Sequence, residues 1–143
     1  MDPRVSVVTL GVKDLEASKR FYVDGFGWKP AYEDTEIIFF QTGGMVFALF
    51  LRDHLAADMQ ADPATFGHAP MALAYNVRAK NEVDPLIQRV VVAGATILSP
   101  PRVAPWGGYS GYFADPDGFA WEVAWNPVWR LAPDGSVELR RGV

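Results

Sequence analysis

The chain has 143 residues, half of them hydrophobic, with a formal net charge of −4 and a sequence pI of about 5.1. This length predicts one domain with one sizeable core. The lack of cysteine excludes disulfides and thiolate metal sites, and the acidic balance argues against a nucleic-acid partner. The first residues lack a signal-peptide pattern and no apolar run reaches membrane-spanning length, so we expect a cytoplasmic protein without a membrane partner.

The first part of the chain predicts a βαβββ module over residues 4–51. Residues 5–12 are rich in β-branched side chains and indicate a strand. Asp14 is a candidate N-cap for a helix that ends at Gly25. Three strands are then expected over residues 28–32, 36–42 and 45–51, with the pair Gly43 and Gly44 as the turn between the last two.

Residues 52–70 form a polar, alanine-rich connection that contains both histidines, His54 and His68. Because it is longer than most loops, we expect it to link two units or to carry a short helix. A second βαβββ pattern covers residues 71–127, with a strand at 71–77 and a helix capped by Asn81 and ended by Gly94. Further strands begin at residues 96, 109 and 119, and residues 128–143 predict a terminal hairpin that packs on the domain or on a second subunit.

The two halves align with each other, residues 9–12 on 74–77 and residues 44–48 on 118–122, which indicates an internal repeat. Alternation along each strand separates large side chains from small ones. The large set should face the helices: Phe47, Leu49, Trp121, Val123 and Trp125. The small set should line an open face together with Glu122: Val46, Ala48, Ala120 and Ala124.

Two motifs carry a resemblance to a known family. Residues 12–22 fit V-x-D-L-x-x-S-x-x-F-Y, and the turn Asp115-Pro116-Asp117-Gly118 precedes a strand that carries Glu122. Together they resemble the vicinal-oxygen-chelate superfamily, which includes glyoxalase I, extradiol dioxygenases, fosfomycin-resistance enzymes and bleomycin-resistance proteins. The resemblance implies an α+β fold in which two βαβββ modules form a curved mixed sheet with a concave groove, in a chain that is often a homodimer.

The resemblance also implies four positions for divalent-metal ligands, one on the first strand of each half and one on the fourth strand of each half. In this chain they are Val7, Ala72, Ala48 and Glu122. Only Glu122 has a donor atom, whereas a bound metal needs about three protein ligands or more. We therefore predict no metal and no other cofactor, with a divalent metal held by other residues, such as the histidines, as the alternative.

Glu122 then has two interpretations. It is either a structural carboxylate hydrogen-bonded to Ser110, Tyr112 or Asn76, or a functional one. A functional carboxylate would anchor a cationic or hydroxyl-bearing ligand, or would act as a base that removes a proton beside a carbonyl.

The other candidate ligand-binding residues are expected around the groove: Val7, Ala48, Phe50, Ala72, Asn76, Arg102, Trp106 and Tyr112. Residues 99–108 are rich in proline and glycine and are interpreted as a shaped lid. In that lid Trp106 would either stack on a planar ligand or plug a hydrophobic gap, and Arg102 would pair with an anionic group.

The sequence leaves three functions open. The first is a metal-free protein of bleomycin-resistance type that binds an aromatic or cationic small molecule, with Glu122 as its polar anchor. The second is an enzyme of glyoxalase or dioxygenase type, working as a lyase, isomerase or oxygenase with Glu122 as a candidate catalytic base. The third is a scaffold that acts mainly through its dimer.

Overall fold

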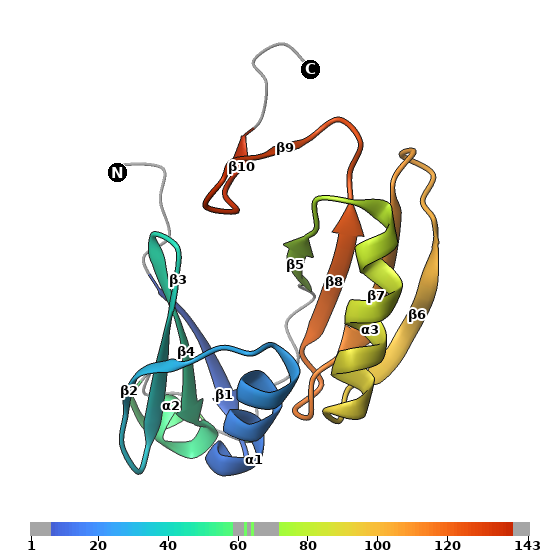
Figure 1. Cartoon of the computed structure of the whole chain (residues 1–143). Coiled ribbons are helices and arrows are strands. Elements are labelled where there is room, and N and C mark those ends of the chain that lie inside the picture. Colours follow the sequence, from blue (N-terminus) through green and yellow to red (C-terminus); the bar gives the residue numbers. More distant parts are fainter. Residues whose placement is uncertain (1–6, 59–61, 63, 65–71, 139–143) are drawn as a thin grey trace. The chain divides into compact units, whose positions relative to one another are not determined.

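A computed structural model of the chain describes residues 7–58, 62, 64 and 72–138 (Figure 1). The chain divides into two compact units, residues 1–69 and 70–143, which we call module one and module two. Each contains a four-stranded sheet, with strand order β1-β4-β3-β2 in module one and β5-β8-β7-β6 in module two. The same order in both sheets confirms the α+β fold of two repeated modules.

Module one contains β1 (Val7–Val12), α1 (Leu15–Arg20), the π-helical turn η1 (Phe21–Gly25), β2 (Pro30–Glu33), β3 (Ile37–Thr42), β4 (Met45–Leu51) and α2 (Arg52–Asp58). Asp14 caps α1 as predicted, because its carboxylate accepts a 2.9 Å hydrogen bond from the Ala17 amide.

An aromatic cluster fills the space between the first helical segment and the sheet of module one. Tyr22 is fully buried, and its ring centroid lies 5.2 Å from Phe47 and 5.8 Å from Trp28, which stacks on it. Leu49 follows Phe47 on the same face of β4 and is also fully buried. The predicted orientation of the large residues of β4 is therefore confirmed.

Helix α2 lies on the opposite face of this sheet. Gly11 and Phe50 are paired in the β1–β4 register, and a Cβ atom on Gly11 would lie 3.2 Å from Leu55 Cδ2 of α2. The Phe50 ring meets the His54 ring edge-on at 6.3 Å. Ala48 shares this face and has no exposed surface. The segment after β4 thus begins with the short helix that the sequence allowed, and this helix packs where ligand-facing residues were expected.

Module two contains β5 (Ala72–Asn76), the 3-10 turn η3 (Lys80–Glu82), α3 (Val83–Val92), β6 (Thr96–Val103), β7 (Tyr109–Ala114), β8 (Ala120–Trp125), β9 (Arg130–Leu131) and β10 (Val137–Glu138). Helix α3 lies across β6, β7 and β8 (Figure 1) and buries Val83, Ile87 and Val90. The predicted Asn81 cap is wrong, because the Glu82 carboxylate accepts a 2.6 Å hydrogen bond from the Ala79 amide at this helix start.

Residues 99–108 form most of a strand and a tight turn where the sequence predicted a lid. Strand β6 continues through Pro100 and Pro101 to Val103, with register shifts against β7 on both sides of Ser99. Prolines are tolerated here because β6 is an edge strand and has no neighbour on one side. The turn closes with a 2.9 Å hydrogen bond from the Ala104 amide to the Gly108 carbonyl.

The predicted terminal hairpin is present as β9 and β10, which pair antiparallel. Arg78 fixes it to module two, because its guanidinium donates to the carbonyls of Leu131 at 3.1 Å, Ala132 at 2.6 Å and Pro133 at 3.1 Å. Residues 139–143, the predicted end of this segment, lie outside the described part. No helix within the described ranges is long and apolar enough to cross a membrane.

Replacing Arg78 with Met should loosen the terminal hairpin and leave the two sheets intact. The change removes three donors, one of them at a partly buried acceptor, which should cost about 1–2 kcal/mol of local stability. Hydrogen exchange of the Ala132 and Gly135 amides, which bond across the hairpin turn, should accelerate. Arg89→Met, at an exposed position of α3, is the matched control. Equal exchange rates in the two variants would contradict this role of Arg78.

Candidate functional site

The register of β8 places Glu122 between Tyr112 and Ala74. Glu122 pairs with Tyr112 of the antiparallel strand β7 and with Ala74 of the parallel strand β5. Because side chains alternate along a strand, residues two apart share a face. We call this side of the sheet the Glu122 face. Its members are Ala72, Ala74 and Asn76 of β5, Ala120, Glu122 and Ala124 of β8, and Ser110, Tyr112 and Ala114 of β7.

The Glu122 face is the side of the sheet opposite α3. Trp121 and Val123, the neighbours of Glu122 in sequence, are buried together with Phe113 on the helix-covered side. Ala72 and Ala74 are exposed, whereas Glu122, Tyr112 and Asn76 are half-buried. Small side chains on β5 therefore leave room beside a carboxylate whose other side is occupied by a phenol ring.

Tyr112 lies directly opposite Glu122, so its hydroxyl is placed to donate a hydrogen bond to the Glu122 carboxylate. Burial of the phenol, the negative charge of Glu122 and this hydrogen bond all raise the pKa of Tyr112 above its ordinary value of 10.0. The phenol therefore stays protonated at neutral pH and acts as a donor. Of the three partners predicted for Glu122, Tyr112 is the residue directly opposite. Ser110 and Asn76 both pair with Ala124, one diagonal step along the same face.

Arg102 and Trp106 are the other two candidates of module two. Arg102 is exposed on edge strand β6, opposite Ser110. The Trp106 indole packs on the turn that contains it, since a Cβ atom on Gly108 would lie only 1.8 Å from Trp106 Cζ3. Half of the Trp106 surface remains exposed. Both alternatives for Trp106, filling a hydrophobic gap and stacking on a ligand, remain predictions.

Val7, Ala48 and Phe50, the remaining candidates, belong to module one. Val7 pairs with Val46 in the same register in which Ala72 pairs with Ala120, so the two modules repeat this geometry. The predicted gathering of Val7, Ala48 and Ala72 around Glu122 remains a prediction.

The residues around Glu122 do not fit a resident metal ion. On β5, Ala74 and Ala72 have no side-chain donor atom, and Asn76 adds only one neutral amide oxygen, which is too few ligands for a divalent ion. Among the described residues, no three His, Asp or Glu side chains gather into a group that could hold an ion. His54 Nδ1 lies 3.1 Å from Glu36 Oε2 in an exposed pair on module one, and His68 lies outside the described residues.

Replacing Glu122 with Gln should lower the pKa of Tyr112 while leaving it above 10, because burial, the largest cause of the shift, remains. In the unaltered chain, the hydrogen bond from Tyr112 to Glu122 can form below the pKa of Tyr112 and is lost as the pH rises through that pKa. The measurement is a pH titration of tyrosine ring carbons by NMR. Tyr109, whose pKa is raised by burial and by Asp84, should titrate unchanged in the variant. If Tyr112 also titrates unchanged, the pairing is absent.

This chain is similar to a family of known proteins in both sequence and structure. The model of the Glyoxalase/Bleomycin resistance protein/Dioxygenase superfamily matches residues 4–123. The crystal structure of a glyoxalase-related enzyme from Fulvimarina pelagi has 50% sequence identity and a TM-score of 0.92, over 96% of this chain and 98% of that one. A glyoxalase/bleomycin resistance protein/dioxygenase from Nocardioides has 25% identity and a TM-score of 0.72, over 87% and 84%. A lactoylglutathione lyase from Agrobacterium tumefaciens shares the fold, with 24% identity and a TM-score of 0.67, over 87% and 94%.

Proposed function

Since this chain belongs to the glyoxalase/bleomycin resistance protein/dioxygenase superfamily, we propose that it binds a small organic molecule on the Glu122 face without a resident metal ion. The observation that carries the proposal is the Glu122 carboxylate, which is paired with one phenol hydroxyl and bordered by small apolar residues.

The proposed ligand is an aromatic or cationic molecule with an N–H or O–H group. A carboxylate has about four acceptor sites, and the Tyr112 hydroxyl uses one of them. An ammonium or hydroxyl group of a ligand would donate to the oxygen sites that remain. A hydrogen bond from Tyr112 would hold the carboxylate in place before the ligand arrives, which would reduce the entropy lost on binding. Exposed Ala72 and Ala74 would contact the apolar part of the ligand.

The second candidate function is that of a glyoxalase-related enzyme, favoured by the 50% identity to the Fulvimarina pelagi protein that bears this description. In that case Glu122 would act as a general base that accepts a proton from a carbon beside a carbonyl group. The electron pair left on that carbon would delocalise onto the carbonyl oxygen. The neutral Tyr112 hydroxyl would then turn from Glu122, which has become protonated, and donate its single O–H to that oxygen. Returning the proton to a different atom would complete an isomerisation.

We also propose that the protein forms a homodimer and acts in the cytoplasm. Exposed apolar side chains of module two, such as Leu98, Val103 and Val128, support an association between subunits, because they place large apolar groups in water.

The binding proposal predicts that Glu122→Gln removes most of the stabilisation that a ligand provides. A thermal-shift screen of aromatic amines and phenols on the intact chain should yield compounds that raise the melting temperature. Loss of a charge-assisted hydrogen bond should weaken binding of those compounds roughly tenfold or more. Glu138→Gln removes a carboxylate from the terminal hairpin and is the charge-matched control. Hits that stabilise Glu122→Gln as well as the unaltered chain would rule out the anchor role of Glu122.

A further inference from the structure

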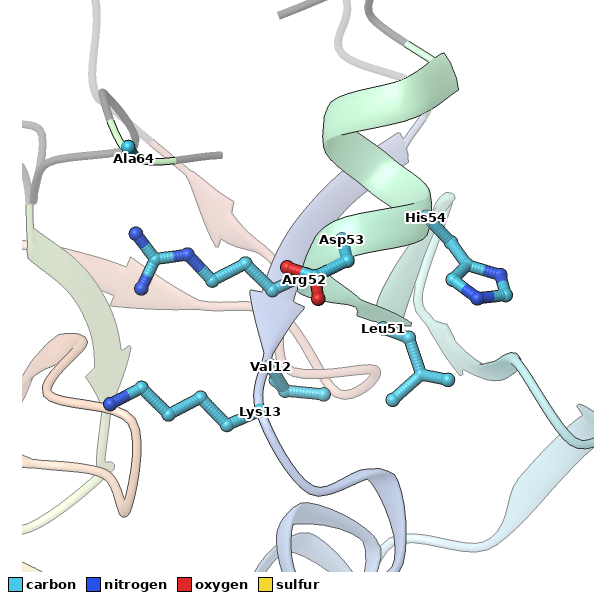
Figure 2. A pocket seen from close by; sticks show the side chains of 7 residues that line it. All are labelled: Val12, Lys13, Leu51, Arg52, Asp53, His54 and Ala64. Atoms are coloured by element: carbon cyan, nitrogen blue, oxygen red, sulfur yellow. The ribbon is translucent and has the colours of Figure 1, made fainter. Parts of the chain in front are cut away.

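A second place with its own chemistry lies in module one, where β1, β4 and α2 meet around a cavity of about 530 Å³ (Figure 2). We infer that this cavity binds a small organic anion, either a carboxylate or a phosphate ester, through Lys13 and Arg52. The inference does not rest on the proposed function of the Glu122 face, because every residue involved belongs to module one.

The two cations are brought together by strand pairing. Strands β1 and β4 run parallel and end in register, with Val12 opposite Leu51. Lys13 and Arg52 follow this last pair, so they leave the sheet from neighbouring strands, whose axes lie about 4.8 Å apart. Figure 2 shows both side chains extending in the same direction, away from His54. A basic pair that is 39 positions apart in sequence thus borders one cavity.

The charge of the lining favours an anion. Lys13 and Arg52 contribute two positive charges and Asp53 one negative charge, whereas the whole chain has a formal net charge of −4. His54 also lines the cavity, and its Nδ1 atom is paired with Glu36. An anion bound in the cavity would be attracted by both positive charges. The planar Arg52 guanidinium can grip two oxygens of one carboxylate or phosphate group, and Lys13 adds a point charge.

The apolar part of the lining indicates that the anion carries an organic group. Buried Val12 and half-buried Leu51 border the cavity beside the cations, and Ala64 closes part of its rim. A volume of about 530 Å³ falls within the range of roughly 300–1,000 Å³ that is common for small-molecule sites. Such a cavity has room for a compact ring or short chain next to the charged head group.

The test titrates the intact, isotope-labelled chain at low salt with benzoate and with phenyl phosphate, and follows the backbone amides by NMR. We expect saturable shifts at Lys13, Arg52 and Asp53 with at least one of these anions, and the stronger binder identifies the head group. Benzylammonium, of similar size and opposite charge, should leave these amides unshifted. Saturation by inorganic phosphate alone, or no saturable shift with either organic anion, would overturn the inference.

Variants then locate the binding. The double change Lys13→Gln with Arg52→Gln should weaken binding by about tenfold or more, whereas Asp53→Asn should strengthen it, because it removes the negative charge from the lining. The matched control, Lys29→Gln with Arg89→Gln, removes two exposed cations outside the cavity and should bind as the unaltered chain does. Glu122→Gln should also bind the anion normally, which separates this site from the Glu122 face. Equal affinity in the double variant and its control would refute the inference.

Discussion

The pairing of Tyr112 with Glu122 depends on the register of two neighbouring strands, and the chemistry proposed for module two depends on that pairing. A slip of β8 by one residue would turn Glu122 toward α3 and expose Trp121 and Val123, both now buried. Burial of large apolar side chains on one face of β8 therefore fixes the acid on the other. The same register sets Ala74 and Tyr112 beside Glu122, so neither of the two flanking strands places a carboxylate or imidazole directly opposite it.

The two modules repeat one pattern of strands and a helix, but different side chains lie on the equivalent face of each sheet. Ala48 occupies in module one the register position that Glu122 occupies in module two, since each lies opposite its counterpart, Thr9 or Ala74. Module one covers this face with α2, whose Leu55 packs on Gly11. Module two leaves the equivalent face with a half-buried carboxylate and small neighbours. One supersecondary pattern thus supports a face covered by a helix in one copy and a face with a half-buried carboxylate in the other.

Local patterns made much of this fold predictable from the sequence. The bounds of β4 and β7 follow from apolar and aromatic runs beside glycine turns, and the orientation of Glu122 follows from alternation along β8. Features that depend on distant residues were not predictable. The packing of α2 requires the missing side chain at Gly11, 41 positions before Arg52. The choice of Tyr112 over Ser110 requires the hairpin register, and the pairing of Lys13 with Arg52 requires parallel strands. The prolines of β6 led to the prediction of a loop, because the neighbouring residues in the sequence do not reveal that a strand lies at the edge of a sheet, where proline is tolerated.

The proposal that no metal ion is bound at Glu122 is the part of the account that one measurement tests most directly. Elemental analysis of the purified chain, after loading with Ni, Zn, Mn and Fe and removal of excess ions, gives the metal content per chain. The account predicts a content far below one ion per chain that does not change in Glu122→Ala, because the neighbours of Glu122 on β5 supply one amide oxygen at most. Near-stoichiometric metal that disappears in Glu122→Ala would contradict it and would make Glu122 a metal ligand.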